Sequence, residues 1–235
     1  MSRLPWVMTQ EWHDVCFLHW PIAPEDIRQY VPKELEIDTF DGAAWLSIVY
    51  FQMKEMRVRF MPAIPRISSF LELNVRTYVK FKEKSGVYFF NLDVNQVLVA
   101  KFAGIGGILP FQYANIYEKR NHNILTFQNR REQDGQAPEI LIASVKPTSE
   151  PIMKTPLDFW LTERHYLWTK AMGMLIQQYN EHTPWILQRA HGIVHENTMV
   201  PFLMCQVQVQ QPIVHYAEYK KAFLYLPIKE GYAEK

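Results

Sequence analysis

Cysteine is almost absent from this sequence, and its scarcity excludes several classes of protein. Only Cys16 and Cys205 occur among the 235 residues, far apart and with no paired spacing. Disulfide frameworks need several cysteines in a short chain, and cysteine-based zinc sites need closely spaced pairs. We therefore expect neither, and the composition favours a reducing compartment. The corresponding prediction is a cytoplasmic protein.

Charge of one sign and long hydrophobic runs are lacking as well. The 25 basic and 24 acidic residues give a formal charge of +1, without a long block of either sign. Surfaces that bind nucleic acids or anionic membranes need clustered Lys and Arg. Residues 1–14 lack the apolar core of a signal peptide, and the apolar stretch 97–111 contains Lys101 and is too short to span a bilayer. We expect neither a nucleic-acid nor a membrane partner.

Glycine is scarce too, with nine residues, and its one cluster does not fit a nucleotide site. A dinucleotide fingerprint that starts at Gly104 would place its third glycine on Leu109, and no helical pattern follows. A tight turn is the better interpretation. The sequence also lacks G-x-S-x-G, so a hydrolase of the nucleophile-elbow type is not expected.

The histidines and the first cysteine offer no clear reactive site. His191 and His195 stand four apart, but Gly192 and the β-branched residues after it favour a strand, on which the two histidines would be roughly 13 Å apart. Cys16 lies in an apolar segment and resembles a buried thiol. Adjacent Glu163 and Arg164 favour structural salt bridges. We expect no metal and no cofactor.

What the sequence does contain is a succession of aromatic, alternating segments. A hydrophobic content of 48% suits a substantial core, and no linker separates two halves, so a single domain over residues 1–235 is expected. A short helix is predicted within 23–32, and a second after Thr155, Pro156 and Asp158, which have N-cap, N1 and N3 spacing. Many strands and few helices predict an antiparallel barrel or sandwich with helices outside.

Turn residues suggest how the strands connect. Asp41-Gly42 predicts a hairpin between the strands on either side of it, and a turn is expected over 84–86. Residues 104–117 are expected to form a glycine turn followed by an aromatic strand. The proline-spaced segment 144–156 is expected to be an extended connection.

The stretch 70–81, FLELNVRTYVKF, has a strict period of two. One face carries Glu72, Asn74, Arg76 and Tyr78, and the other is apolar. Neighbours on one face of a strand are roughly 6.6 Å apart, so a small ligand could span the first three side chains. A solvated strand face is the alternative. For this stretch taken alone the solvated face is the favoured interpretation. Predicted strands on both sequence sides place it in the middle of a sheet, Tyr78 continues its polar face, and both details weaken that interpretation.

Several segments carry a resemblance to a known family. They are PWVMTQEWHDVCFLHWPI, IRQYVPKELEIDTFDGAAW, SSFLELNVRTYV, VYFFNLDV, FWLTERHY and HTPWILQRA. Over nearly the whole chain they resemble the YqjF-type family of uncharacterised bacterial proteins, domain of unknown function 2071. That family is in turn similar to the acetoacetate decarboxylases, which share the pattern seen here as IRQYVPKELEID. The resemblance implies a closed, cone-like antiparallel β-barrel with helices outside and a ligand cavity within.

The resemblance also implies site residues. Glu72 occupies the position of a decarboxylase carboxylate that faces the cavity, and an arginine of the decarboxylase pocket falls on His13 by ungapped counting. The decarboxylases carry two lysines just after a proline, of which the first forms a Schiff base. Here the matching segment is LPFQY, residues 109–113. Phe111 and Gln112 occupy the positions of the two lysines, so both lysines are missing. Phe111, Gln112 and Tyr113 are candidate ligand contacts.

The missing lysines remove the reaction that the resemblance would suggest. Imine chemistry needs an amine that is partly neutral near pH 7, and an ordinary lysine, with a pKa of about 10.4, is not. Lys101 and Lys80 are the nearest lysines in sequence, and neither obviously replaces the lost nucleophile. We therefore expect decarboxylation through an imine to be absent.

Three functions stay open at this point. The first is a barrel that binds a small organic ligand, anionic or carbonyl-bearing, with Asn74, Arg76 and aromatic side chains. The second is a cofactor-free lyase, hydratase or isomerase that uses Glu72 as general acid or base. The third is a structural or interaction protein in which Glu72 and Arg76 form a buried ion pair. The resemblance to oligomeric decarboxylases makes a homo-oligomer an option that no residue pattern demands.

Overall fold

Strands dominate the protein. The computed structural model describes residues 5–103, 109–203, 207–208 and 210–230. Its strands are β1 Met8–Ile22, β2 Glu36–Ile37, β3 Ala44–Val58, β4 Phe70–Phe81, β5 Lys84–Val94, β6 Phe111–Tyr113, β7 Asn115–Asn121, β8 Ile124–Gln133, β9 Gln136–Pro151, β10 Tyr166–Ala171, β11 Met174–His182, β12 Gln188–Asn197, β13 Ile213–Leu224 and β14 Ile228–Glu230. The predicted mainly β fold class with few helices is confirmed.

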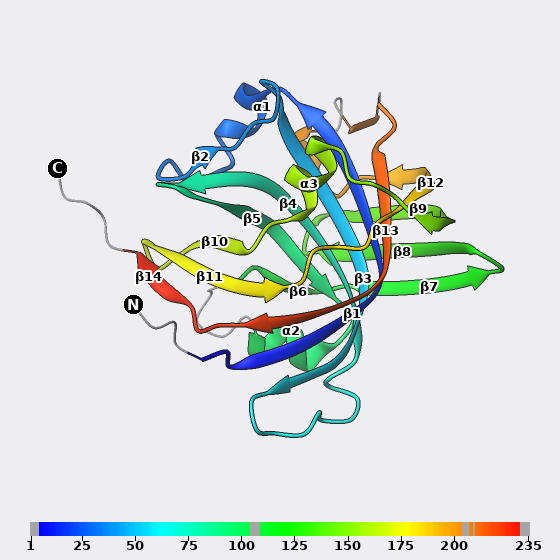
Figure 1. Ribbon diagram of the computed structural model, residues 1–235, viewed down its shortest axis with the longest axis horizontal. Coiled ribbons are helices and arrows are strands. Elements are labelled where there is room, and N and C mark those ends of the chain that lie inside the picture. Colours follow the sequence, from blue (N-terminus) through cyan, green and yellow to red (C-terminus); the bar gives the residue numbers. More distant parts are fainter. Residues whose placement is uncertain (1–4, 104–108, 204–206, 209, 231–235) are drawn as a thin grey trace.

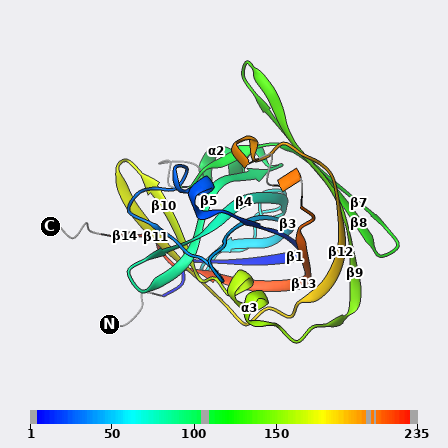
Figure 2. The same ribbon diagram turned by 90° about the horizontal axis from the view of Figure 1, so that it is seen from above.

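Seven strands pair around a ring, seen from above in Figure 2. Their order is β1, β3, β4, β5, β10, β11, β13, and β13 pairs with both β11 and β1. The contact between β11 and β13, which closes the ring, is short and pairs Asn180–His182 with residues 222–224. One neighbouring pair, β5 with β10, runs parallel, so the ring is not antiparallel throughout. This parallel contact joins segments about 80 residues apart, which no local pattern in the sequence indicates.

A second layer lies outside the ring. Strands β12, β9, β8 and β7 continue the sheet from β13 and curve away from the ring strands (Figure 1). The main hydrophobic core fills the space between the layers, with Cys16, Leu18 and Leu46 from the ring packed in one cluster with Phe127 and Ala143 from the outer strands. Cys16 is fully buried, as expected of a structural thiol.

The two-residue period decides which side chains enter the ring. On β1 and β3 the side chains that point away from the main core, such as Phe17, Val49 and Phe51, belong to a second cluster inside the ring. On β4, Leu73 and Val75 join the core between the layers, so Glu72 and Asn74 point to the opposite, inner face. Strand β4 lies between β3 and β5, which confirms its predicted central position.

The described helices are short and lie at the periphery of the ring. They are α1 Pro24–Arg28, α2 Val97–Ala103, α3 Pro156–Thr162 and the 3-10 turn Pro201–Leu203. The predicted cap of α3 is confirmed: the Thr155 hydroxyl accepts from the Asp158 amide, and the Asp158 carboxylate accepts from the Thr155 amide. Helix α2 was not expected from the sequence. No helix within the described residues has the length and apolar character needed to cross a bilayer.

Three local predictions need correction. Asp41-Gly42 does form a turn with positive φ angles, but β2 pairs with β4 rather than with β3, and only an isolated bridge spans the turn. The turn before β5 lies at residues 82–83, because Lys84 already pairs with Phe81. Most of the segment 144–156 belongs to β9, paired with β12. The predicted glycine turn at 104–108 and Cys205 lie outside the described residues.

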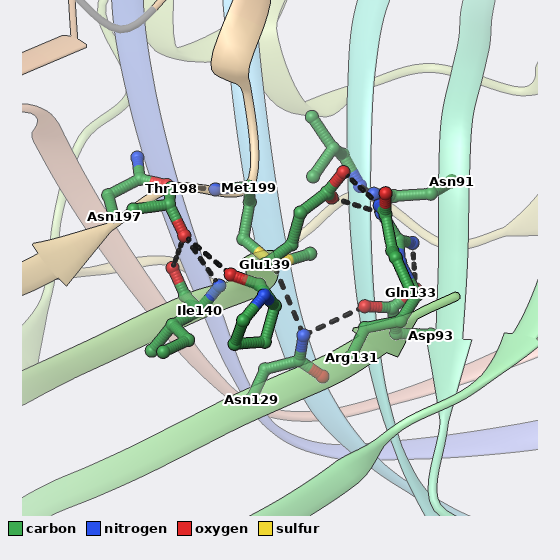
Figure 3. A network of polar contacts seen from close by, with 12 residues as sticks. Asn91, Asp93, Asn129, Arg131, Gln133, Glu139, Ile140, Asn197, Thr198 and Met199 are labelled. Carbon is green, nitrogen blue, oxygen red and sulfur yellow. Dashed lines mark hydrogen bonds and ion pairs between the residues drawn. The ribbon is translucent and has the colours of Figure 1, made fainter. Parts of the chain in front are cut away.

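A buried polar network joins the ring to the outer strands (Figure 3). Arg131 on β8 donates to Asp93 of β5 at 2.6 Å and also pairs with Glu139 of β9. The Asn129 amide donates to the other Asp93 oxygen at 2.8 Å. Asp93 is fully buried, and desolvation raises its pKa to about 6 although Arg131 acts in the opposite direction.

Candidate functional site

A cavity of about 110 Å³ lies inside the ring, and each of the seven ring strands contributes at least one side chain to its wall. An adjoining pocket of about 440 Å³ is mainly apolar and is lined by residues that include Met53, Met56 and Phe70. The two share Gln10, Glu72 and Phe111 among other residues. The first cavity, called the polar compartment here because its largely apolar wall also carries Glu72, Asn74 and Arg76, adjoins the apolar compartment, and Glu72 lies at their junction.

The predicted row of β4 lines the polar compartment. Glu72, Asn74 and Arg76 all contribute to its wall because they share the inner face of the strand. Glu72 is 6% exposed and Asn74 is 3% exposed. The Asn74 amide nitrogen lies 3.4 Å from Glu72 Oε1, a long hydrogen bond. A strand face open to solvent, the alternative for this stretch, does not match this burial.

The environment of Glu72 favours its neutral form. Burial raises the pKa of its carboxyl to about 8; the hydrogen bond from Asn74 lowers the pKa, and the nearby charge of Asp93 raises it further. Among the ion pairs of the described residues, none joins Glu72 to Arg76. The buried ion pair that the structural hypothesis required is not formed.

Five buried polar atoms on residues that line the cavity lack hydrogen-bond partners within the described chain: Asn74 Oδ1, Arg76 Nε, Arg164 Nη2, Asn180 Oδ1 and Trp185 Nε1. Arg164 lies just after α3, and its Nη1 donates to Asp38 at 2.6 Å. Burial lowers the pKa of the Arg76 guanidinium, and the charge of Arg164 acts in the same direction. Buried polar atoms without partners are costly, so this wall is suited to a polar ligand.

Tyr78 and His13 are not among the residues that line either pocket. Tyr78 continues the β4 row but is fully buried beneath α3, where its hydroxyl donates to the Leu161 carbonyl at 3.0 Å and lies 3.1 Å from His19 Nδ1. The register of β1 shifts between His13 and Cys16, with Asp14 at φ 52°. This irregularity directs Trp12 into the cavity, while His13 packs on Tyr219 with ring centroids 5.1 Å apart.

The LPFQY segment contributes one clear wall residue. Phe111 lines both compartments, whereas Gln112 and Tyr113, the next two residues of β6, are exposed and absent from both linings. Lys80 pairs at the surface with Asp38 at 2.9 Å, and Lys101 is exposed on α2. No lysine of the described chain lines either compartment.

Several cavity residues were missed in the sequence. Arg164 and His165 follow α3, and Gln178, Asn180 and His182 occupy alternate positions of β11. The period-two row in MLIQQYNEH was a usable signal of the same kind as the β4 row. Glu163 and Arg164 do point apart as expected, toward separate partners, Lys154 and Asp38.

Comparison with known proteins agrees with this arrangement. A sequence model of a family of uncharacterized conserved proteins, domain of unknown function 2071, matches residues 9–221. The chain belongs to this family. It is 37% identical over 227 residues to the uncharacterized protein YqjF of Bacillus subtilis strain 168, with 96% of this chain and 93% of that protein covered.

Solved structures of low identity share the fold. An acetoacetate decarboxylase-like enzyme from Sphingomonas wittichii RW1 has a TM-score of 0.68 at 11% identity, covering 97% of this chain and 94% of the other. The enduracididine biosynthesis enzyme MppR, complexed with pyruvate, has a TM-score of 0.66 at 13% identity, covering 97% and 91%. Acetoacetate decarboxylase from Legionella pneumophila has 0.65 at 10%, covering 98% and 88%. The predicted decarboxylase-like fold is confirmed.

Proposed function

We propose that this family member binds a small organic acid or carbonyl compound inside the ring. The observation that carries the proposal is the set of unpartnered polar atoms on Asn74, Arg76 and Arg164 in one cavity wall. Two guanidinium donors suit the oxygens of a carboxylate, and the amide oxygen of Asn74 suits a hydroxyl or amide hydrogen. The protein as a whole is expected to be cytoplasmic, and a homo-oligomer remains an option.

The balance of charge supports an anionic ligand. Glu72 is mostly neutral at pH 7 because its pKa is about 8, and the Arg164 guanidinium is compensated by Asp38. Arg76, which is partly exposed to the cavity, then carries a positive charge with no ion-pair partner among the described residues, and its buried Nε lacks a hydrogen-bond partner. A carboxylate ligand would supply both the opposite charge and the missing acceptor.

The apolar compartment supports a ligand with a hydrocarbon part. Met53, Met56, Ile67 and Phe70 line it, and flexible methionine side chains adapt to ligands of varied shape. A carboxylate or carbonyl head would lie at Arg76, and an aliphatic or aromatic tail would extend past Glu72. The pyruvate complex of the structural neighbour MppR shows that a related fold holds a keto acid.

The pKa of Glu72 favours a second candidate, an enzyme that uses this carboxyl as general acid or base. A catalytic group works best when its pKa lies near the operating pH, and about 8 meets that condition. The reaction would be a cofactor-free lyase, hydratase or isomerase step on a bound acid. With no lysine on the described cavity wall, we expect no imine, so borohydride with a keto acid should leave no adduct on any lysine.

Thermal unfolding in the presence of carboxylic acids tests the binding proposal. The panel contains 2-keto, 3-keto and 3-hydroxy acids of increasing chain length, each with its neutral amide. We expect a concentration-dependent rise in Tm for acids that exceeds that for amides and grows with chain length, because binding to the native state alone stabilises it. Equal responses to acids and amides, or none to either, would contradict the proposal.

Two variants separate the candidates. Glu72→Gln keeps the shape of the side chain and removes the titrating proton, so it should retain binding in both cases and abolish turnover only if Glu72 is catalytic. Arg76→Gln should lose the response to acids. Arg66→Gln, an exposed arginine outside both compartments, is the matched control and should respond like the unaltered protein.

A further inference from the structure

Three side chains with metal-ligating atoms lie close together at the cavity, in the segments that follow α3 and end β11. Glu163, His165 and His182 place one ligand atom each within 4.8 Å of one another. His165 and His182 line the cavity, and all three side chains are at least partly buried. The pair of histidines is held together by strand pairing, because β10 and β11 form an antiparallel hairpin at whose open end both residues lie.

The hydrogen bonds of the two histidines set their tautomers. His165 Nδ1 lies 3.0 Å from the Asn180 carbonyl oxygen, and His182 Nδ1 lies 2.9 Å from the Thr183 carbonyl oxygen. A carbonyl oxygen can only accept, so each Nδ1 carries the hydrogen and donates it. In the neutral form of each ring, Nε2 is then the nitrogen that keeps its lone pair. Histidine ligands of metals are oriented in this way, by a hydrogen bond from the other ring nitrogen.

The carboxylate also has an oxygen to offer. Both hydrogen bonds of Glu163 in the described chain, from the Lys154 ammonium and from the Trp185 amide, go to Oε1. Its side chain is 5% exposed and is therefore fixed in position. Two neutral imidazoles and one carboxylate form a three-ligand set that Zn²⁺ uses in catalytic sites, with a fourth position left for water or substrate.

We propose that Glu163, His165 and His182 form a binding site for a divalent transition metal ion, with Zn²⁺ as the best match. The fourth position would face the cavity, because both histidines line its wall. The proposal goes beyond the organic-acid site and does not depend on Glu72 or Arg76. Two cations face the site: Lys154 on Glu163, and Lys220, which donates to the carbonyls of Thr183 and Pro184. The positive charge of each lysine repels a bound metal ion, so replacing either lysine by a neutral residue should raise the metal affinity.

Titration of the tag-free, chelator-treated full chain with Zn²⁺ by calorimetry tests the site, with no organic acid present. We expect one ion per chain. His182→Gln and His165→Gln should each weaken binding by at least about tenfold, since loss of a residue that only supports a ligand already costs about 10- to 100-fold. His191→Gln, an exposed histidine on β12, is the matched control and should bind as the unaltered chain does. Thermal unfolding without metal verifies that each variant is folded.

Two further readouts make the test independent of any one variant. Lys154→Gln removes a competing cation, so it should tighten Zn²⁺ binding by about two- to fivefold, the range of a partly exposed ion pair. Trp185 and Trp12 pack near His182, with ring centroids 5.5 and 6.4 Å away, so Co²⁺ or Cu²⁺ should quench tryptophan fluorescence with the same stoichiometry. Substoichiometric binding by the unaltered chain, or binding by both histidine variants as tight as that of the unaltered chain, would overturn the proposal.

Discussion

Glu72 is the residue whose protonation ties the stability of the protein to its proposed function. It is buried on β4 at the junction of two compartments, and its pKa of about 8 lies well above that of an exposed glutamate. A carboxyl with a raised pKa stays protonated in the folded state at pH values where the unfolded chain has already released the proton. The same desolvation that disfavours its charge would make it a usable proton donor near neutral pH.

The pH dependence of unfolding follows from this shift. Between the unfolded pKa of Glu72 and about 8, the native state binds more protons, so the free energy of unfolding falls as pH rises, by up to about 1.4 kcal/mol per pH unit. Asp93, with a pKa of about 6, contributes in the same direction only below that pH. Histidines whose pKa is lowered by desolvation, His13, His19, His182 and His215, act in the opposite direction up to about pH 7, because the unfolded chain then binds more protons at these positions. The contribution of Glu72 is therefore the difference between two proteins: urea unfolding from pH 6 to 8 should show a more negative slope for the unaltered chain than for Glu72→Gln. An unchanged slope in the variant would refute the assignment.

At the scale of strands, the network around Arg131 is one of the polar contacts that join the ring to the outer strands. In another, Glu118 and Arg120 on β7 bind Tyr50 and Asp14 of the ring. Arg131 and its neighbour Arg130 stand on β8 and point to opposite faces. Arg131 pairs with buried Asp93, while Arg130 pairs with exposed Glu132. The adjacent arginines therefore form a natural comparison between a buried and a solvated ion pair.

Arg131→Met should lower the free energy of unfolding by about 3–5 kcal/mol, because it leaves the Asp93 carboxyl buried without its cation. Arg130→Met should change it by less than about 1 kcal/mol, because the pair that it breaks is solvated. Urea unfolding at pH 7 measures both. Similar effects of the two substitutions would show that the network does not support the contact between the layers.

The parallel contact between β5 and β10 depends on a glycine. A Cβ atom at Gly86 would lie 2.3 Å from the backbone oxygen of Tyr166, its partner on β10. Backbone on both sides cannot give way without separating the strands. Gly86→Ala should therefore destabilise the protein by about 1–3 kcal/mol and loosen the ring at this point. Ser85→Ala on the same strand is the control and should be close to neutral. Thermal unfolding and proteolysis of the β10–β11 hairpin are the measurements.

At the scale of the whole molecule, the sequence predicts what depends on local periodicity. The inner face of β4, the cap of α3 and the buried thiol of Cys16 all follow from residues within one element, and the structure has each of them. The decarboxylase-like fold followed from the family resemblance and not from periodicity alone. These features need no knowledge of distant partners.

Features that depend on distant partners or on single-residue irregularities could not be predicted. The pairing of β2 with β4 and of β5 with β10 is non-local, and neither has a signature in the adjacent residues. The irregularity at Asp14 changes which residues of β1 point inward, so counting without gaps placed His13 at the cavity and the structure places Trp12 there. The alternating polar residues of β11 are visible in the sequence, but only the pairing of strands around the ring brings them to the same cavity as those of β4.

The ring brings side chains from separate strands to one cavity that contains Arg76 and adjoins an apolar pocket. The central claim is that this cavity binds an organic acid. Calorimetric titration of a medium-chain 2-keto acid tests this most directly, with the unaltered chain, Arg76→Gln and Arg66→Gln compared at one pH. We predict one site per chain, at least about tenfold weaker in Arg76→Gln, as expected for loss of a charge-assisted contact, and unchanged in Arg66→Gln. Equal affinity in all three proteins, or no binding by the unaltered chain across the acid panel, would contradict the account.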